Sequence, residues 1–315
     1  MSFSIKKTIK IVLPLLLGGF LVWYSLSKIS IQILIGYFRN ANYWWISLGL
    51  FFGVLSHLSR AYRWRFLLEP LGFKPKLGNS ILAVLVGYLV NLALPRAGEV
   101  SRAVVMVNYE EIPFEKGFGT IVAERIADLV MMFVVIGITL FVQFDFIYTL
   151  LLEKFNPLKI ILILVIFGVG FFVLSTFVKK ASSGILLKIK TFFNGLLEGV
   201  TSIFKMKKKW AFLFHTFFIW TMYVLMFWST IPAIEGLEVP LGGILIGFIA
   251  GAFSIAATNG GIGLYPIAVA GAFALFGIET EPANAFGWIM WTTQTAMIIV
   301  FGGLAFIFLP IYNKK

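Results

Sequence analysis

Long apolar runs separated by short charged loops dominate this chain. Runs of the length needed to cross a bilayer, about 20 residues, or slightly shorter, predict six membrane-spanning helices at residues 11–27, 44–59, 117–144, 157–178, 210–231 and 284–309. Two further regions, 79–108 and 239–278, each contain two apolar legs joined by a break at Pro95 or at residues 259–261. The pattern therefore predicts an all-α polytopic membrane protein with about six full spans and two helical hairpins.

The composition agrees with a membrane protein and excludes an ordinary soluble domain. Hydrophobic residues make up 60% of the 315 residues, and charged residues only 13%. The absence of cysteine rules out disulfides, thiolate catalysis and cysteine-bound metal. The two histidines, His57 and His215, lie alone in apolar runs, so we expect packing or a single hydrogen bond and no metal site.

The distribution of charge predicts the topology. Residues 179–209 hold eight lysines and one acid, Glu198, whereas the loops with Glu235, Glu238, Glu279 and Glu281 hold no basic residue. By the positive-inside rule, the lysine-rich segment and both termini face the cytoplasm. The net charge of +12 therefore predicts contact with anionic lipid headgroups and not with nucleic acid.

This topology makes the two hairpins open from opposite sides of the membrane. Hairpin 79–108 would enter from the cytoplasm and hairpin 239–278 from outside, as in inverted repeats with broken helices. We divide the chain into a first half, 1–178, a basic cytoplasmic linker, 179–209, and a second half, 210–315. The legs of the second hairpin are also compatible with two tilted full spans.

The main polar motif follows directly on an apolar leg. Residues 91–102 read N-L-A-L-P-R-A-G-E-V-S-R and bring Arg96, Glu99 and Arg102 into an apolar part of the chain. Each such charge costs about 2.5–3.5 kcal/mol at the centre of a membrane helix. We therefore expect these residues at a surface or in a protein-lined polar cavity. They form either a phosphate-binding headgroup site or a salt-bridge network that stabilises the hairpin.

A second charged cluster starts another apolar run. Glu124, Arg125 and Asp128 can neutralise the arginines of the first motif, with Arg125 as a structural residue. The alternative is a site for a cationic headgroup or a proton-coupling carboxylate. Arg60 and Arg63 close the predicted span 44–59, where stop-transfer and snorkelling compete with a gating role at a cytoplasmic entrance.

The hairpin breaks suggest how an anion could be bound. Pro95 and Pro266 stand near the start of each returning leg, where proline fits the first turn of a helix. Each returning leg would then direct a partially positive helix N-terminus into the membrane interior. Asn259, Gly260, Gly261 and Gly263 form either a tightly packed turn or a backbone nest for an anionic substrate.

The motifs themselves resemble a known family. L-P-R-A-G-E-V-S-R, the R-A-Y-R-W at residues 60–64, the A-E-R-I-A-D at 123–128 and the G-G-I-G at 260–263 look like motifs of the lysylphosphatidylglycerol synthase transmembrane (flippase-like) family. The resemblance implies a bacterial or archaeal inner-membrane protein that moves lipids between leaflets. It does not extend to the soluble aminoacyl-transferase domain of that synthase. Asn259 stands where the family commonly has proline, and Pro266 where it commonly has glutamate.

We therefore expect a lipid translocase for a polar-headed, anionic phospholipid or lipid-linked substrate. The alternative is a secondary transporter of a small organic anion; an intramembrane lipid-modifying enzyme is disfavoured. We expect no catalytic residues and no cofactor, and a homo-oligomer stays open. The predicted substrate-binding residues are Asn91, Arg96, Glu99, Arg102, Glu124, Asp128, Asn259, Gly260, Gly261 and Gly263, with Arg60, Arg63, Pro95, Arg125 and Pro266 as structural or gating residues.

Overall fold

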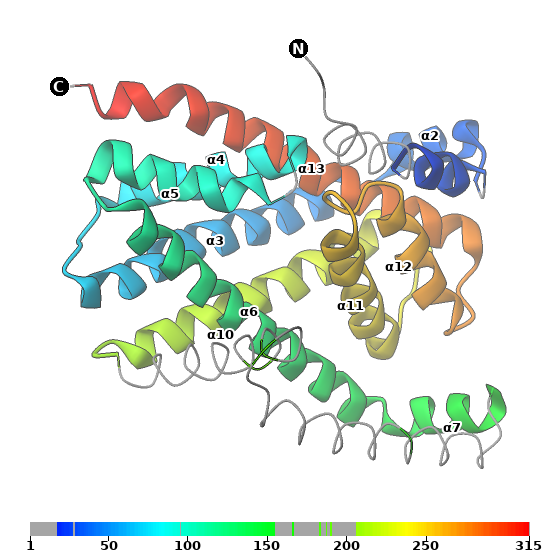
Figure 1. The fold of residues 1–315 in the computed structure, drawn as a ribbon. Coiled ribbons are helices and arrows are strands. Elements are labelled where there is room, and N and C mark those ends of the chain that lie inside the picture. The colour runs from blue at the N-terminus through cyan, green and yellow to red at the C-terminus, as the bar shows by residue number, and fades with distance from the viewer. Residues whose placement is uncertain are drawn as a thin grey trace. The chain divides into compact units, whose positions relative to one another are not determined.

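The computed structural model describes residues 18–27, 29–94, 96–154 and 206–314, together with residues 166, 183, 187 and 190. Pro95, the predicted span 157–178, most of the linker 179–209 and part of the predicted span 11–27 lie outside these residues. Every element in the described part is helical (Figure 1). The chain divides into two compact units, Met1–Val122 with Trp210–Lys315, and Ala123–Lys209, and each is described by itself.

The first unit begins with two short helices and one long helix. The helix Gly18–Leu26 is followed by α2 (Ile31–Asn40), and α3 (Tyr43–Leu68) starts where Asn42 Oδ1 accepts a hydrogen bond from Trp44 N–H at 3.1 Å. The 3₁₀ turn η1 (Glu69–Leu71) and the left-handed Gly72 terminate it. The helix therefore continues beyond the predicted span 44–59, through the arginines to Leu68.

The first predicted hairpin consists of α4 (Leu77–Ala93) and α5 (Ala97–Glu110), which pack side by side (Figure 1). Its base is held together by Glu110, whose Oε1 accepts from Lys76 N–H at 3.0 Å and from Asn79 Nδ2 at 2.6 Å. Asn79 also exchanges hydrogen bonds with Asn313 near the C-terminus. The contacts of the buried Asn79 amide fix where the hairpin begins.

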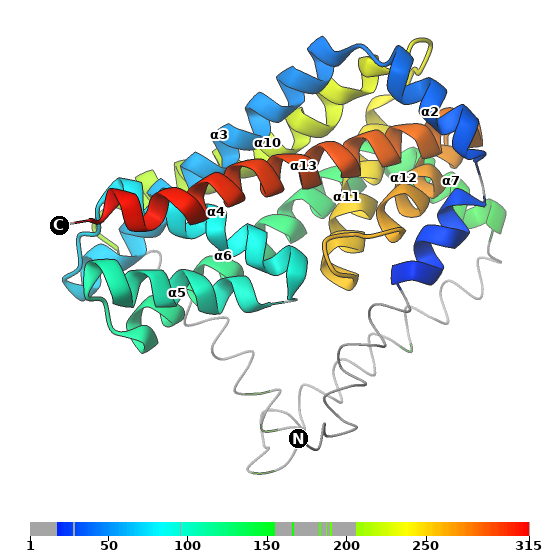
Figure 2. The same ribbon diagram turned by 90° about the horizontal axis from the view of Figure 1, so that it is seen from above.

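The second predicted hairpin consists of α11 (Leu241–Ala257) and α12 (Leu264–Ala274). It follows α10 (Lys209–Thr230) and the 3₁₀ turn η2 (Ile231–Ala233), and precedes α13 (Thr280–Tyr312). Helix α13 packs against α12 and also along α4, so it links the two hairpins (Figure 2). Edge-on and stacked rings of Phe227, Phe248, Phe273 and Phe286 form the apolar core beside α12.

Three helices of the described chain are long and apolar enough to cross a membrane: Phe114–Val142 (α6), Lys209–Ala233 and Thr280–Tyr312. They coincide with the predicted spans 117–144, 210–231 and 284–309. The pair Gly18–Leu26 and Ile31–Asn40 gives a fourth if it counts as one span. The total of six spans stays a prediction.

The four hairpin legs are shorter than a membrane span. α4 and α11 have 17 residues each, α5 has 14 and α12 has 11. At about 1.5 Å per residue, the longest of them reaches about 25 Å, whereas the hydrocarbon core is about 30 Å thick. Each leg is therefore shorter than the roughly 20 residues of a typical membrane span.

The second unit is described through the remainder of α6, from Ala123 onward, and α7 (Phe144–Lys154). Gln143 connects the two helices: its N–H donates to Thr139 O, and its own carbonyl accepts from Ile147 N–H, both at 2.9 Å. The unit carries the charged cluster Glu124, Arg125 and Asp128 on the first turns of this α6 segment.

Candidate functional site

The tips of the two hairpins touch each other. Asn259, in the turn between α11 and α12, donates from Nδ2 to the main-chain carbonyl of Leu92 in α4 at 2.8 Å. The neighbouring Gly260 also lies against Leu92, and its carbonyl accepts from Trp291 Nε1 at 2.8 Å. Residues 167 positions apart in the sequence are thereby joined at one polar junction.

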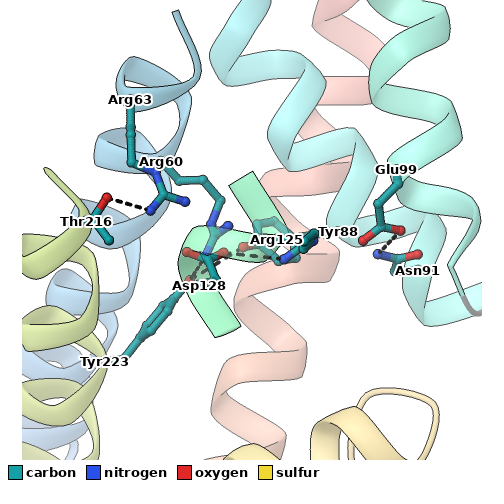
Figure 3. A network of polar contacts seen from close by, with 9 residues as sticks. All are labelled: Arg60, Arg63, Tyr88, Asn91, Glu99, Arg125, Asp128, Thr216 and Tyr223. Carbon is teal, nitrogen blue, oxygen red and sulfur yellow. Dashed lines mark hydrogen bonds and ion pairs between the residues drawn. The ribbon is translucent and has the colours of Figure 1, made fainter. Parts of the chain in front are cut away.

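The tip of the first hairpin adds two polar side chains to this junction. Asn91 Oδ1 accepts from Gly98 N–H at 2.7 Å, and Asn91 Nδ2 lies 3.4 Å from Glu99 Oε2 (Figure 3). Asn91 therefore caps the first turn of α5, where main-chain N–H groups lack partners within the helix. Asn91, Glu99 and Asn259 are all half-buried, which leaves part of each side chain accessible at the junction.

The two arginines of this hairpin lie in different surroundings. Arg96 precedes α5 with a left-handed φ of 63° and is exposed. Arg102 is 3% exposed and its guanidinium lies 4.3 Å from the ring centroid of Trp64. The Trp64 indole is itself fixed, because Nε1 donates to Thr120 Oγ1 at 2.9 Å. Arg96 is thus available to a ligand at the surface, whereas Arg102 packs inside the protein.

The turn of the second hairpin is built from glycines in left-handed conformations. Gly260, Gly261 and Gly263 have φ values of 65°, 80° and 69°. Residues with a Cβ adopt such positive φ values only at a cost in conformational energy. A Cβ on Gly263 would also lie 2.5 Å from the main chain of Leu21 and Val22. The turn is therefore tightly packed, and its predicted role as an anion nest stays a prediction. Pro266 is the third residue of α12, within the first turn as predicted.

Two arginines of α3 are buried, which the sequence alone did not indicate. Arg60 and Arg63 are 3% and 0% exposed. Arg60 Nη2 donates to Tyr223 Oη at 3.2 Å and Arg63 Nη1 to Thr216 Oγ1 at 3.0 Å, both on α10 (Figure 3). Snorkelling toward a headgroup layer is therefore the wrong explanation, since both side chains turn into the protein. In the sequence, only the three-residue spacing of the two arginines, which places them on one face of the helix, was consistent with this burial.

The histidines follow the prediction for packing or a single hydrogen bond. His215 Nδ1 lies 2.8 Å from Ser59 Oγ and its ring packs against Tyr62 and Phe66. The ring of His57 lies 4.4 Å from that of Tyr88 on α4. Tyr88 and Tyr223 have no distinguishing sequence signal, although Tyr223 accepts a hydrogen bond from the buried Arg60 and the Tyr88 hydroxyl lies 3.5 Å from that of Tyr223.

In the second unit, the charged cluster includes an ion pair within α6. Arg125 Nη1 lies 3.8 Å from Asp128 Oδ2, one turn further along α6 (Figure 3). The Arg125 side chain is 40% exposed, whereas that of Asp128 is only 12% exposed. The prediction that Glu124 and Asp128 neutralise Arg96 and Arg102 is not tested by these contacts and stays a prediction.

Comparisons with known proteins match nearly the whole chain to one family model, described as the lysylphosphatidylglycerol synthase TM region, over residues 11–303. The chain is similar to UPF0104 membrane protein MJ1595 of Methanocaldococcus jannaschii, with 29% identity over 226 residues, 65% of this chain. It is also similar to glycosyltransferase AglD of Haloferax volcanii, with 34% identity over 88 residues, 28% of this chain. The matched part makes up 64% of the length of MJ1595 and 14% of the length of AglD. No solved structure matches the chain with statistical significance.

Proposed function

The chain belongs to the lysylphosphatidylglycerol synthase TM region family of multi-pass membrane proteins, and from this we propose that it acts on membrane lipids, as a translocase. The family takes its name from an enzyme whose product is an aminoacylated phospholipid, and one relative is named a glycosyltransferase. Both names favour a lipid or a lipid-linked substrate with a polar headgroup. In this proposal the chain moves the substrate and does not modify it.

The observation that carries the proposal is the polar junction between two hairpins whose legs are shorter than a typical membrane span. We infer that both hairpins are re-entrant, one from each side, and that their tips meet near the midplane. The lysine-rich segment 179–209 and both termini then face the cytoplasm of a bacterial or archaeal inner membrane, with the lysines on anionic lipid. A headgroup would pass the junction while its chains stay in hydrocarbon.

The residues at the junction divide into two roles. Arg96 is exposed beside the tip, so its guanidinium suits the lipid phosphate, while Glu99, Asn91 and Asn259 offer polar partners to the headgroup. Arg102 is buried over Trp64, which favours a role in positioning α5. The tips separate when a headgroup passes, because the hydrogen bond from Asn259 to Leu92 closes the junction at rest.

Lipid movement in proteoliposomes tests this proposal. Fluorescent phosphatidylglycerol and phosphatidylcholine are followed by one-sided quenching for the wild type, Arg96→Ala and Glu99→Gln. Arg39→Ala, an exposed arginine on α2, is the matched control for loss of one positive charge. We expect movement in the wild type and control, and its loss in the two tip variants.

The other results also decide between functions. If no lipid moves with or without an ion gradient, while a small organic anion is taken up, the chain is a solute transporter. If lipid movement survives both substitutions, the charges at the tip are structural and the assigned site is wrong.

A further inference from the structure

An apolar cavity of about 230 Å³ lies between α3, α4 and α13 in the first unit. Its walls are Val54 and Leu58 from α3, Ile81 and Leu85 from α4, and Ile298 and Phe301 from α13. Leu58 and Phe301 are 39% and 41% exposed, so the cavity opens at the outer surface of the helices. In a membrane protein that surface faces hydrocarbon chains, which can enter without crossing a polar layer.

One buried polar side chain faces this apolar space. His57 lines the cavity and is only 8% exposed. Neither of its ring nitrogens has a hydrogen-bond partner among the residues that the structure describes. A buried donor or acceptor is normally satisfied, so an unpaired imidazole in an apolar wall indicates a ligand that carries an oxygen or nitrogen at this point.

Beyond His57, the surroundings become polar and then cationic. Tyr88 also lines the cavity, and its ring lies 4.4 Å from that of His57. Its hydroxyl is 3.5 Å from that of Tyr223, which accepts a hydrogen bond from Arg60. Figure 3 shows Tyr88, Tyr223 and Arg60 around this point. An apolar cavity that ends at a histidine and a tyrosine matches an amphiphile whose apolar chain begins at a polar group.

We propose that this cavity binds one hydrocarbon chain of a membrane phospholipid, with the ester group at the start of that chain at His57. The volume is below the roughly 300–1,000 Å³ of pockets for drug-sized ligands, so it holds part of a single chain. A neutral imidazole donates one hydrogen bond, which suits an ester carbonyl at the start of the chain. The inference deepens the proposed function and rests on it for the choice of a phospholipid as the occupant.

Photo-crosslinking of a phosphatidylglycerol with a diazirine in one acyl chain tests the cavity in phosphatidylcholine nanodiscs. We expect adducts on the wall residues Val54, Leu58, Ile81, Leu85, Ile298 and Phe301 in the wild type. Leu85→Trp fills the cavity and should lower the yield of these adducts about tenfold, equivalent to about 1.4 kcal/mol. The matched control is Ile299→Trp, since Ile299 is 52% exposed and is not part of the cavity wall; it should leave the yield unchanged.

His57→Phe tests the hydrogen bond from the imidazole separately from the apolar contacts of the chain. This variant should lower adducts of the ester-linked probe about fivefold, the effect of one hydrogen bond, and should not change those of a pure alkyl diazirine. Thermal unfolding of each variant identifies any that fail to fold. Equal adducts in Leu85→Trp and the wild type, or adducts spread evenly over exposed residues, would overturn the proposal.

The experiment also distinguishes the chain site from lipid movement. Adducts in the cavity without movement in proteoliposomes would refute the translocase and keep the chain site. Lipid movement in proteoliposomes without adducts in the cavity would refute the chain site and keep the translocase.

Discussion

Helices α4 and α5 pack tightly where Gly87 faces Gly98, so Gly98→Ala tests the hairpin that carries the proposed site. A Cβ on Gly98 would overlap the carbonyl oxygen of Gly87, and would lie 2.6 Å from Cγ and 2.7 Å from Nδ2 of Asn91. The oxygen belongs to the main chain and cannot turn away. To accept the methyl group, the two helices must move apart.

The cost has two parts. Overpacking of this kind costs about 1–3 kcal/mol, and loss of the hydrogen bond from Gly98 N–H to Asn91 adds about 1 kcal/mol, as for other helix caps. We therefore expect a loss of about 2–4 kcal/mol. At about 2 °C per kcal/mol for a chain of this size, the unfolding midpoint should fall by about 4–8 °C.

Thermal unfolding in detergent, followed by intrinsic fluorescence, measures this change, and lipid movement is recorded on the same preparations. Gly303→Ala on α13 is the matched control, because a Cβ there meets nothing within 4 Å in the described part of the chain. It should be neutral or slightly stabilising, as alanine is a better helix former than glycine. A Gly98→Ala protein as stable as this control would refute the close crossing of α4 and α5.

Three further substitutions test the surrounding contacts. Arg102→Ala should lower stability by about 2 kcal/mol, because a desolvated cation–π contact with Trp64 is lost. Arg102→Lys should lower it less. Equal losses for the two variants in a chemical-denaturation series would argue against the ring contact. Thr216→Val removes the acceptor of a buried Arg63 hydrogen bond and should cost about 1–3 kcal/mol, whereas Thr292→Val, at an exposed site on α13, should cost almost nothing in the same series. Asn259→Ala should cost about 1 kcal/mol and speed hydrogen exchange at both hairpin tips; unchanged exchange at residues 89–93 would show that the tips are held without this bond.

The sequence predicted the positions of those helices whose apolar runs are about as long as a membrane span. The spans beginning near residues 117, 210 and 284 were predicted within a few residues, because about 20 apolar residues have few alternatives to a membrane helix. The continuation of α3 beyond the predicted span, from Arg60 to Leu68, was not predicted, since arginines after an apolar run usually mark a membrane boundary. Here Tyr223 and Thr216 of α10 provide polar partners, and no local pattern in α3 reveals them.

For the candidate site too, features of neighbouring residues could be predicted from the sequence, whereas contacts between distant residues could not. The polar character of residues 91–102 and the glycine turn at 260–263 could be read directly from the sequence. The different surroundings of Arg96 and Arg102 could not, because they depend on Trp64 and Gly87, which come from other helices. Likewise, the hydrogen bond from Asn259 to Leu92 joins positions far apart in the chain, and nothing in either motif specifies the other as its partner.

Reversible crosslinking of the two hairpin tips tests the central claim most directly. The chain has no cysteine, so Leu92→Cys with Gly260→Cys introduces a single pair, at positions where a Cβ on Gly260 would lie 3.3 Å from Leu92 Cδ2. We expect that a short bifunctional thiol reagent or oxidation stops lipid movement in proteoliposomes. Reduction of the disulfide should restore it, and neither treatment should change lipid movement in the single variants. Lipid movement at the wild-type rate in fully crosslinked protein would contradict the claim that headgroups pass between the hairpin tips.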